Sequence, residues 1–470
     1  MSCDSAVPIV PSAHRRPRLS TVQGTEVSLS IEAGLSALRA PVVRAAIFST
    51  YPPWACGIGT FAFDVRSALL GIPGIADVDL VAVVDEPSTS QRSEVLATVS
   101  QEARGDYVRA ARLLGRLDIE VVLLQHEFGI FGGADGEYVL SFAQALTQPL
   151  VVTLHTVLSQ PSPNQLRVLT ALCNEAELLI VMTDTARRLL VEVGACPVEK
   201  IRVVPHGAPV ELGRRRDERA AGRCPLYVAP TPGGYERMQS RFLLSTFGLL
   251  STGKGLETAI EALPVIVERH PEVFYMIAGR THPQVGRQEG EQYRLMLERL
   301  VVDLGLDDHV AFDDRFLSID ELADLLAVTD VFLTPYRSRE QISSGALTFA
   351  IASGCTAVST PYWYAEDMLA SGAGQIVPFD DPKALAEAVC QLVEKPELLE
   401  AARAEAWRIG SQLTWPSVAS ATARVLLEAT MYPMPQSLPR SDVCRTTSRS
   451  SQRRIGRGTK SVSGRLGDER

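Results

Sequence analysis

No stretch of about 18 consecutive apolar residues occurs in this chain, so the sequence offers no candidate for a transmembrane helix. The first 18 residues also lack the apolar core of a secretory signal, and they contain several prolines and the pair Arg15-Arg16 instead. Both absences lead us to expect a cytoplasmic protein.

Cysteine pairs with CxxC spacing are absent as well, and none of the eight cysteines has histidine partners at the spacing of metal ligands. We therefore expect reduced structural thiols and no metal site. An excess of basic residues is also missing, because the net charge is −9 at pH 7. This charge argues against a nucleic-acid partner held by phosphate contacts.

A chain of 470 residues is too long for one compact domain and fits two. From Arg44 onward, short apolar runs alternate with amphipathic stretches of helical length. Continuous apolar runs are typical of strands that are buried on both faces. The repeated alternation of strand and helix predicts an α/β fold with parallel, doubly wound sheets.

The predicted elements follow from this alternation. In the first half, strands are expected at 45–49, 79–84, 120–124, 150–154, 178–182 and 201–204, with helices near 60–70, 100–115, 135–147, 163–175 and 184–193. In the second half, strands are expected at 244–250, 273–278, 309–312, 331–335, 355–359 and 375–377, with helices at 255–269, 290–304, 319–328, 344–353, 364–371, 382–394 and 396–410. Pro264 should kink or shorten the helix that contains it.

The same patterns divide the chain into six segments. They are a flexible N-terminal extension (1–43), a first Rossmann-like domain (44–208), a linker or loop (209–243), a second Rossmann-like domain (244–412), a C-terminal helix (413–435) and a disordered basic tail (436–470). The tail holds nine basic and three acidic residues. We expect it to be solvated, and the alternative is weak attachment to anionic lipid or another polyanion.

Open parallel sheets bind ligands at the carboxyl ends of their strands, where loops lead into helices. Gly57 and Gly59 lie between the first strand and the first helix, where backbone amides favour an anion, although a plain tight turn explains them equally well. The loop is not a full GxGxxG motif, so a nicotinamide-dependent dehydrogenase is poorly supported. His126 with Glu127 follows the third strand and His155 ends the fourth, which predicts two histidines at one cleft.

The second half offers two candidate anion sites. Lys254 stands between two glycines at the start of a helix, where it suits a phosphate pair, and the alternative is a solvated lysine. Ser343, Ser344 and Gly345 precede an apolar helix, where small residues leave amides open to an anion. The alternative for this loop is an ordinary helix N-cap.

Several segments together carry a family resemblance: Ile201–Gly207, Phe247–Gly255, Ile277–Pro283, Pro335–Gly354 and Val358–Glu366. Over roughly residues 44–430 the chain resembles the family 4 retaining glycosyltransferases of the GT-B fold, and most of all a mannosyltransferase-like branch. The resemblance implies two Rossmann-like domains that face a central cleft.

The resemblance also implies roles for single residues. Lys254 and His155 would be catalytic, the lysine on the donor diphosphate and the histidine on the transferred sugar. Trp415 would begin a helix that crosses back to the first domain. Donor contacts would come from Gly57, Gly59, Arg280, Thr281, Gln341, Ser343, Ser344 and Gly345, and His126 and Glu127 would lie on the acceptor side.

The implied reaction is transfer of a hexose, with mannose favoured, from a nucleotide sugar to a glycan, lipid or small-molecule acceptor. GDP-mannose is the favoured donor, and neither a metal nor a cofactor is expected. The chain would act in the cytoplasm, and its basic tail could bring it to the inner face of the membrane. The rival hypotheses are a GT-B epimerase or phosphorylase, and a catalytically impaired protein that only binds sugar nucleotides.

The chain departs from the family pattern at three positions, and the first two of these departures support that last alternative. Gln341 and Phe349 occupy the positions of two family glutamates, the second of which commonly grips the nucleotide ribose. Leu249 stands where the family often has an arginine that binds the diphosphate, a charge that Arg280 could supply.

Overall fold

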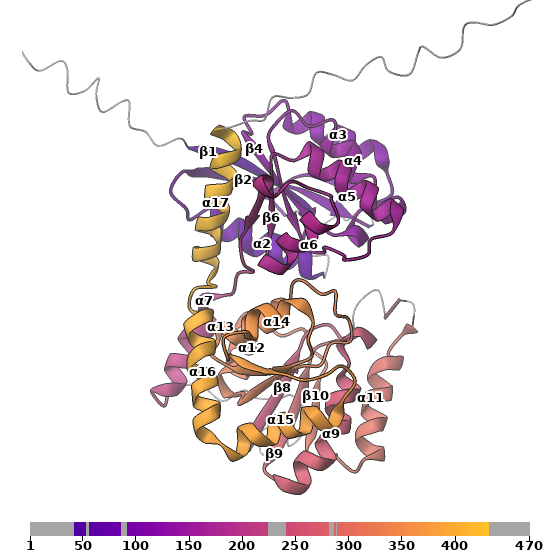
Figure 1. The fold of residues 1–470 in the computed structure, drawn as a ribbon. Coiled ribbons are helices and arrows are strands. Elements are labelled where there is room, and N and C mark those ends of the chain that lie inside the picture. Colours follow the sequence, from indigo (N-terminus) through magenta and orange to yellow (C-terminus); the bar gives the residue numbers. More distant parts are fainter. Residues whose placement is uncertain are drawn as a thin grey trace, which may run out of the picture.

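The chain folds into two α/β domains, each built on a parallel sheet, and one lies above the other in Figure 1. The computed structural model describes residues 42–52, 56–85, 92–223, 241–281, 286–287 and 289–431. The predicted basic tail and nearly all of the predicted N-terminal extension lie outside these residues. Within the described ranges, no helix is long and apolar enough to cross a bilayer.

The first domain is built on a seven-stranded sheet in the order β3-β2-β1-β4-β5-β6-β7, with every pair parallel. Its strands are β1 (Val43–Thr50), β2 (Ile75–Val84), β3 (Val95–Ser100), β4 (Val121–His126), β5 (Leu150–Leu154), β6 (Leu178–Val181) and β7 (Ile201–Val203). Its helices are α2 (Gly57–Leu69), α3 (Arg104–Leu114), α4 (Val139–Ala143), α5 (Pro163–Glu175) and α6 (Asp184–Glu192), with the short 3₁₀ turns η2 (Phe128–Ile130), η3 (Ala134–Gly136) and η4 (Val198–Lys200).

The second domain is built on a six-stranded sheet in the order β10-β9-β8-β11-β12-β13, again parallel throughout. Its strands are β8 (Phe242–Phe247), β9 (Val273–Ala278), β10 (Val310–Asp313), β11 (Val331–Thr334), β12 (Thr356–Ser359) and β13 (Gly374–Ile376). They alternate with η5 (Thr252–Lys254), α9 (Leu256–Arg269), α11 (Gln292–Asp303), α12 (Ile319–Val328), α13 (Gly345–Ala352), α14 (Trp363–Leu369), α15 (Pro382–Glu394) and α16 (Pro396–Gly410).

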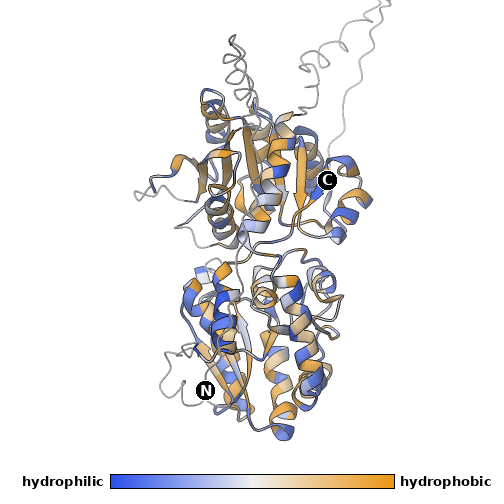
Figure 2. Cartoon of the chain, turned by 90° about the vertical axis from the view of Figure 1, so that its left-hand side faces the viewer, coloured by the Kyte–Doolittle hydropathy of each residue, from blue (hydrophilic) through white to orange (hydrophobic). Residues whose placement is uncertain are grey.

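Both sheets are covered by helices, and their strands are largely hydrophobic while the helices carry hydrophilic residues as well (Figure 2). Strands β4 and β5 are buried along their whole length, as expected for central strands of a doubly wound sheet. The predicted fold of two Rossmann-like, parallel-sheet domains is therefore confirmed.

Three elements differ from the sequence prediction. Strand β3 was not expected, because its residues form no continuous apolar run, and of its side chains only that of Val99 is buried. The helix predicted at 135–147 shrinks to α4, because Asp135 inside the preceding turn has a positive φ of 51°. Helix α9 continues through Pro264 to Arg269, so the proline does not shorten it.

Part of the segment expected as a linker or loop at 209–243 is helical. Helix α7 (Val210–Ala220) packs against α12 of the second domain. The Nε atom of Arg215 lies 2.7 Å from a carboxylate oxygen of Asp324 on α12. The expectation of a loop is thus wrong for the residues of α7, while residues 224–240 lie outside the described ranges.

The chain crosses between the domains twice, and the two crossings are hydrogen-bonded to each other. The amide of Ala208 donates to the carbonyl of Leu413 at 2.7 Å, and the amide of Trp415 donates back to the carbonyl of Ala208 at 2.9 Å. Helix α17 (Trp415–Met431) then packs on α2, β4 and β5 of the first domain, as the yellow helix of Figure 1 shows. The first domain is therefore completed by the last described helix.

Candidate functional site

Two of the predicted site residues, one from each domain, meet where the carboxyl ends of the two sheets face each other. The hydroxyl of Ser343, in the loop before α13, donates to the backbone carbonyl of His155 at 3.1 Å. A second contact across the domains joins the Ser159 hydroxyl to the Glu340 carboxylate at 2.5 Å. The candidate loop of the second domain thus contacts the candidate histidine of the first.

His155 follows β5, and its side chain is held within the first domain. Its Nε2 atom lies 2.9 Å from the amide oxygen of Gln125, and the ring of Phe61 meets the imidazole edge-on with centroids 4.8 Å apart. Burial, together with smaller contributions from the nearby His206 and His126, lowers the pKa of His155 to about 3. The ring is therefore neutral at physiological pH.

His126 ends β4, but its ring lies in the core of the first domain between the rings of Phe128 and Phe131. Neither ring nitrogen has a hydrogen-bond partner among the described residues. Burial lowers the pKa of His126 to about 4. The expectation of a role on the acceptor side does not fit a ring buried in this way.

Glu127, the other residue expected on the acceptor side, is hydrogen-bonded locally. Its carboxylate accepts from the Thr156 hydroxyl at 2.5 Å and from the amide of Phe128 at 3.0 Å. Burial nevertheless raises the pKa of Glu127 above its usual value. This carboxylate fixes the turn after β4 to the segment that follows His155.

The glycine loop at the start of α2 is only partly open. A methyl group placed on Gly57 would meet no atom within 4 Å, so a ligand could approach the backbone there. Gly59 is buried, and its amide already donates to the sulfur of Cys56 at 3.2 Å. Of the two predicted glycines, Gly57 keeps the open surface that donor binding needs.

Lys254 projects over an aromatic ring at the carboxyl end of the second sheet. Its Nζ lies 4.0 Å from the ring centroid of Tyr336, which stacks on Tyr362 at 4.9 Å. The phenol of Tyr362 neighbours the hydroxyl of Ser344, so the stacked rings connect the lysine to the loop before α13. Gly255 is needed behind the lysine, because its φ is +59° and a Cβ would lie 2.1 Å from the carbonyl oxygen of Pro335.

The loop before α13 shows the N-cap that the sequence offered as an alternative, and the anion site stays a prediction. The hydroxyl of Ser344 accepts from the amide of Leu347 at 3.3 Å, which is ordinary N-capping. Gly345 faces the first domain, because a Cβ there would lie 3.3 Å from Nε2 of His206. The side chain of Gln341 holds the loop by donating to the carbonyl of Ser343 at 3.1 Å.

His206 and Gln125 are members of the site that the sequence analysis did not single out. His206 follows β7, so the rule that selected the other two histidines at strand ends could have found it. Its Nδ1 lies 2.7 Å from the carbonyl of Gly207, and burial lowers its pKa to about 4. Gln125 gave no signal because its role depends on a partner 30 residues away.

Arg280 and Thr281 follow β9 and differ in their availability. The guanidinium of Arg280 is exposed and lies 5.8 Å above the ring of Phe316. Thr281 is buried, and its hydroxyl donates to the carboxylate of Glu291 at 2.5 Å. Only Arg280 is therefore free to turn its polar group toward a ligand.

Two family models match the chain, and together they cover more than half of it. Residues 241–395 match the model described as "Glycosyl transferases group 1", and residues 78–212 match "Glycosyltransferase Family 4". The chain belongs to family 4 of the glycosyltransferases.

Curated relatives and solved structures agree with this family. The chain is 27% identical over 292 residues to the phosphatidyl-myo-inositol mannosyltransferase of Mycolicibacterium smegmatis, a match that covers 60% of this chain and 66% of the relative. The enzyme of the same name from Mycobacterium leprae is 30% identical over 255 residues, which are 52% of this chain and 58% of the relative. The matched region thus spans less than two thirds of each relative.

The structural neighbours show the GT-B fold. Anabaena Alr3699/HepE in complex with UDP is 17% identical with a TM-score of 0.60, and the match covers 82% of this chain and all of that one. Sucrose-phosphate synthase from Thermosynechococcus elongatus is 16% identical with a TM-score of 0.63, over 82% of this chain and 98% of that chain.

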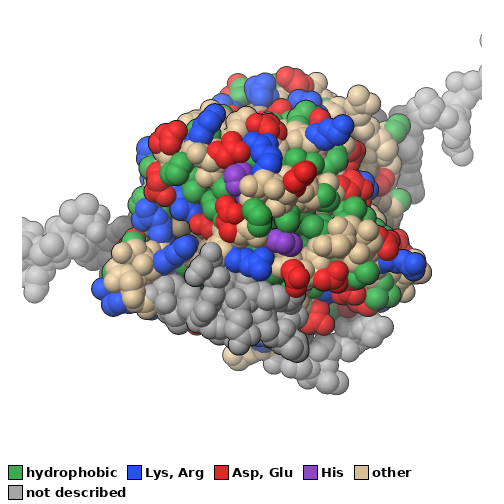
Figure 3. Space-filling view, turned by 90° about the horizontal axis from the view of Figure 1, so that it is seen from below, with side chains coloured by type: hydrophobic (Ala, Val, Ile, Leu, Met, Phe, Trp, Pro, Cys, Tyr) green, Lys and Arg blue, Asp and Glu red, His purple; other side chains and the backbone are tan. Residues whose placement is uncertain are grey.

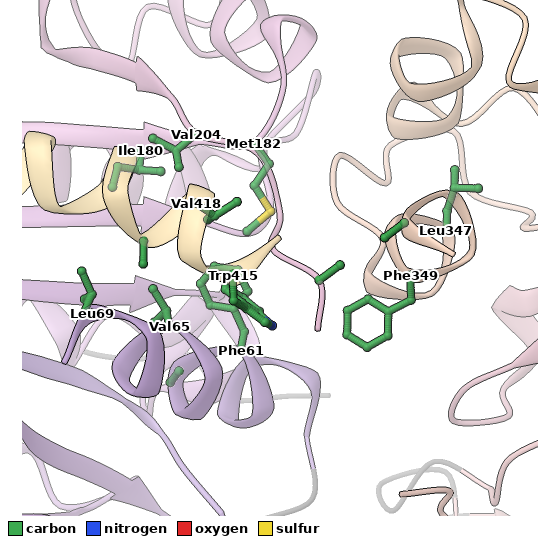
Figure 4. Close-up of a cluster of buried hydrophobic side chains, with 14 of the residues drawn as sticks. Phe61, Val65, Leu69, Ile180, Met182, Val204, Leu347, Phe349, Trp415 and Val418 are labelled. Carbon is green, nitrogen blue, oxygen red and sulfur yellow. The ribbon is translucent and has the colours of Figure 1, made fainter. Parts of the chain in front are cut away.

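This family 4 member fills the positions of the missing glutamates with other contacts. Phe349 packs against His206 and stacks on Phe247, with centroids 6.2 Å apart in both pairs. Figure 4 shows its ring on the second domain, across from Trp415. The carboxylate of Glu340, one position before Gln341, accepts a hydrogen bond from Ser159 of the first domain.

The described residues contain no group of three or more His, Cys, Asp or Glu side chains that could hold a metal ion. On the face seen in Figure 3, acidic and basic side chains are interspersed. Among the predicted site residues, Lys254 and Arg280 are the ones that carry a permanent positive charge at neutral pH.

Proposed function

We propose that this protein is a retaining glycosyltransferase that moves a hexose from a nucleotide sugar to an acceptor. The observation that carries the proposal is that Lys254 and the loop before α13 lie at one end of the second sheet, where this loop contacts His155 of the first domain. A donor bound there would have its diphosphate on the second domain and its sugar beneath the first. HepE of Anabaena, which shares this fold, is known in complexes with UDP and with UDP-glucose, and this supports a donor of that class.

In the proposed reaction, negative charge grows on the leaving diphosphate. The ammonium of Lys254 and the amides at the start of α13 would stabilise this charge, because both are fixed before the reaction begins. A ring whose pKa is about 3 is a neutral imidazole at neutral pH, so His155 would not act as a general acid. It would act through hydrogen bonds to the transferred sugar. No metal is required in this scheme, so transfer should persist in EDTA.

The donor and acceptor are proposed from the relatives. Mannose is favoured because the two curated relatives described above are named mannosyltransferases, and GDP-mannose is accordingly the favoured donor. Their names also favour a lipid-linked acceptor, although a glycan or a small molecule fits the same transfer. Binding to an anionic inner membrane face through the basic tail would suit a lipid acceptor.

The first experiment is thermal unfolding of the full chain with GDP-, UDP- and ADP-sugars. A ligand that binds only the folded state raises the melting temperature by mass action, so selectivity among the three would identify the base. Transfer is then measured with the stabilising donor and a panel of lipid, glycan and small acceptors. If none of the nucleotide sugars changes the melting temperature, the proposal fails.

A second candidate function is a catalytically impaired protein that binds sugar nucleotides. Gln341 and Phe349 favour it, because they replace two family glutamates and Phe349 is packed among aromatic rings. Stabilisation by a donor without transfer or hydrolysis would support this candidate. An altered sugar formed without acceptor would indicate an epimerase, and cleavage that depends on phosphate would indicate a phosphorylase.

A further inference from the structure

The side chain of Gln125 is placed against His155 and is completely buried. Gln125 lies in β4 next to His126, and β4 pairs with β5, the strand that leads to His155. The amide oxygen of Gln125 is 2.9 Å from Nε2 of His155. An amide oxygen only accepts hydrogen bonds, so Nε2 must carry the hydrogen.

The nitrogen end of the amide has room for a partner of its own. Its Nε2 group has no partner among the described residues, and Gln125 lines a small cavity of about 10 Å³ together with Thr153. A cavity of this size is close to the smallest that holds one water molecule. A water there would accept from the amide nitrogen and leave the amide oxygen for His155.

His206, which packs on the same phenylalanine ring as His155, is expected to be the other tautomer. The ring of Phe61 contacts both histidines edge-on, with centroids 4.8 Å from His155 and 5.0 Å from His206. The Nδ1 atom of His206 lies 2.7 Å from a backbone carbonyl oxygen, which can only accept. His206 should therefore carry its hydrogen on Nδ1, and His155 should carry its hydrogen on Nε2.

We propose that Gln125 is a positioning residue that fixes His155 as the Nε2–H tautomer. The free nitrogen, Nδ1, then presents a lone pair that accepts a hydrogen bond from a hydroxyl group of the transferred sugar. Ser343 holds the backbone of the same residue through its carbonyl. The tautomer is a property of the folded chain, whereas the contact with sugar rests on the proposed function.

The tautomers can be read from the ¹⁵N chemical shifts of labelled histidines in the full-length protein. We expect the Nε2–H form for His155 and the Nδ1–H form for His206. The variant Gln125→Met keeps the length of the side chain but loses the amide. In this variant the His155 signals should move toward a mixture of tautomers, while those of His206 stay unchanged. An Nδ1–H form of His155 in the wild type, or unchanged signals in the variant, would overturn the proposal.

Gln125→Glu gives a second test that keeps an oxygen acceptor at the same place. A carboxylate beside Nε2 favours the charged ring, so His155 should begin to titrate at a higher pH than in the wild type. His206 serves again as the internal control. Identical titration of His155 in wild type and Gln125→Glu would count against a direct contact.

Donor analogues test the sugar contact separately. If Nδ1 accepts from a sugar hydroxyl, replacing that hydroxyl by fluorine should lower kcat/KM about tenfold, because fluorine cannot donate and one hydrogen bond is lost. The loss should shrink in Gln125→Met. A fluorinated donor series with no loss at any position would refute the contact with sugar, and failure of every nucleotide sugar would refute the proposed function, while the tautomer result would stand in both cases.

Discussion

At the residue scale, the site is notable for histidines that are neutral because they are buried. The pKa values of His126 and His206 are lowered to about 4 and that of His155 to about 3. In the unfolded chain a histidine has a pKa near 6.5. Between these values the unfolded state binds more protons than the folded state, so the free energy of unfolding must fall as the pH drops from about 6.5 toward 4.

Replacing His126 by phenylalanine should remove one of the groups that bind a proton on unfolding, and it removes no hydrogen bond. We expect His126→Phe to be more stable than the wild type at pH 5, and the slope of stability against pH to flatten by up to about 1.4 kcal/mol per pH unit. Urea unfolding at pH 5, 6 and 7 measures this slope. Parallel curves for the two proteins would show that His126 is not the buried neutral base that its surroundings indicate.

Lys254 is the residue on which the proposed chemistry most depends. Lys254→Ala should lower transfer by about two orders of magnitude, because a fixed positive charge at the leaving group is lost. Lys383, an exposed lysine at the start of α15, is the matched control, and Lys383→Ala should keep full activity. Near wild-type transfer by Lys254→Ala, measured at saturating donor, would exclude its role.

Single residues were predictable from sequence where a local rule applied to them. Lys254 and His155 were found because strand ends and helix starts can be read from the pattern. Gln125 and Tyr336 were not, because a hydrogen bond to His155 and a ring beneath Lys254 arise only from the folded sheets. His126 shows the limit of this rule, because a position at a strand end does not reveal whether the side chain points into the cleft or into the core.

At the scale of elements, the junction between the two crossings is tightly packed. A Cβ on Gly207 would lie 2.2 Å from the ring of Trp415, the first residue of α17. Gly207→Ala should therefore destabilise the protein by about 1–3 kcal/mol through overpacking. Gly129→Ala is the control, since a Cβ there meets nothing within 4 Å. Chemical denaturation of both variants checks the difference, and equal stabilities would contradict the packing.

Helix α2 carries one carboxyl group, that of Asp64, whose pKa is shifted to near neutrality. Burial, with the nearby Glu211 carboxylate, raises the pKa of Asp64 to about 7, and Trp415 partly opposes this shift. The folded state then holds a proton that the unfolded state releases, so Asp64 lowers stability as the pH rises from about 4 to 7. Asp64→Asn should be more stable than the wild type at pH 8 and equally stable near pH 4, as measured by thermal unfolding. A gain of the same size at both pH values would rule out ionisation as the cause.

Elements were predictable when their own pattern determined them. The strand at 150–154 and the helices at 163–175, 319–328, 382–394 and 396–410 have the predicted bounds. The edge strand β3 was missed because an edge strand is not buried on both faces. Helix α7 was missed because the arginines, prolines and glycines of 209–243 interrupt the alternation of apolar runs, whereas Arg215 forms an ion pair with Asp324 on α12.

At the scale of the whole molecule, a few polar contacts hold the two domains in their present arrangement. Asp367 of α14 accepts from the hydroxyl of Thr185 at 2.8 Å and from its amide at 3.3 Å, at the start of α6. Sequence patterns could not predict how the domains face each other, because this contact joins residues 182 positions apart.

Removing this contact should shift the molecule toward an open form. Two hydrogen bonds to a charged group are worth about 1.5 kcal/mol or more in total, so Asp367→Ala should raise the ratio of open to closed molecules roughly tenfold. Small-angle X-ray scattering would then give a larger radius of gyration. Asp184→Ala, which removes an exposed carboxylate on α6 paired only locally with Arg187, should leave it unchanged. An unchanged radius in Asp367→Ala would mean that other contacts hold the domains.

Helix α17 has a consequence for how the protein is made. The ribosome completes the seven strands of the first sheet long before it reaches Trp415, yet the surface of α2, β4 and β5 that α17 covers is apolar. During synthesis, more than 200 residues must therefore be added while this surface remains without its final cover. The first domain is begun first and finished last, so a chaperone that shields it until translation ends would protect the nascent chain from aggregation.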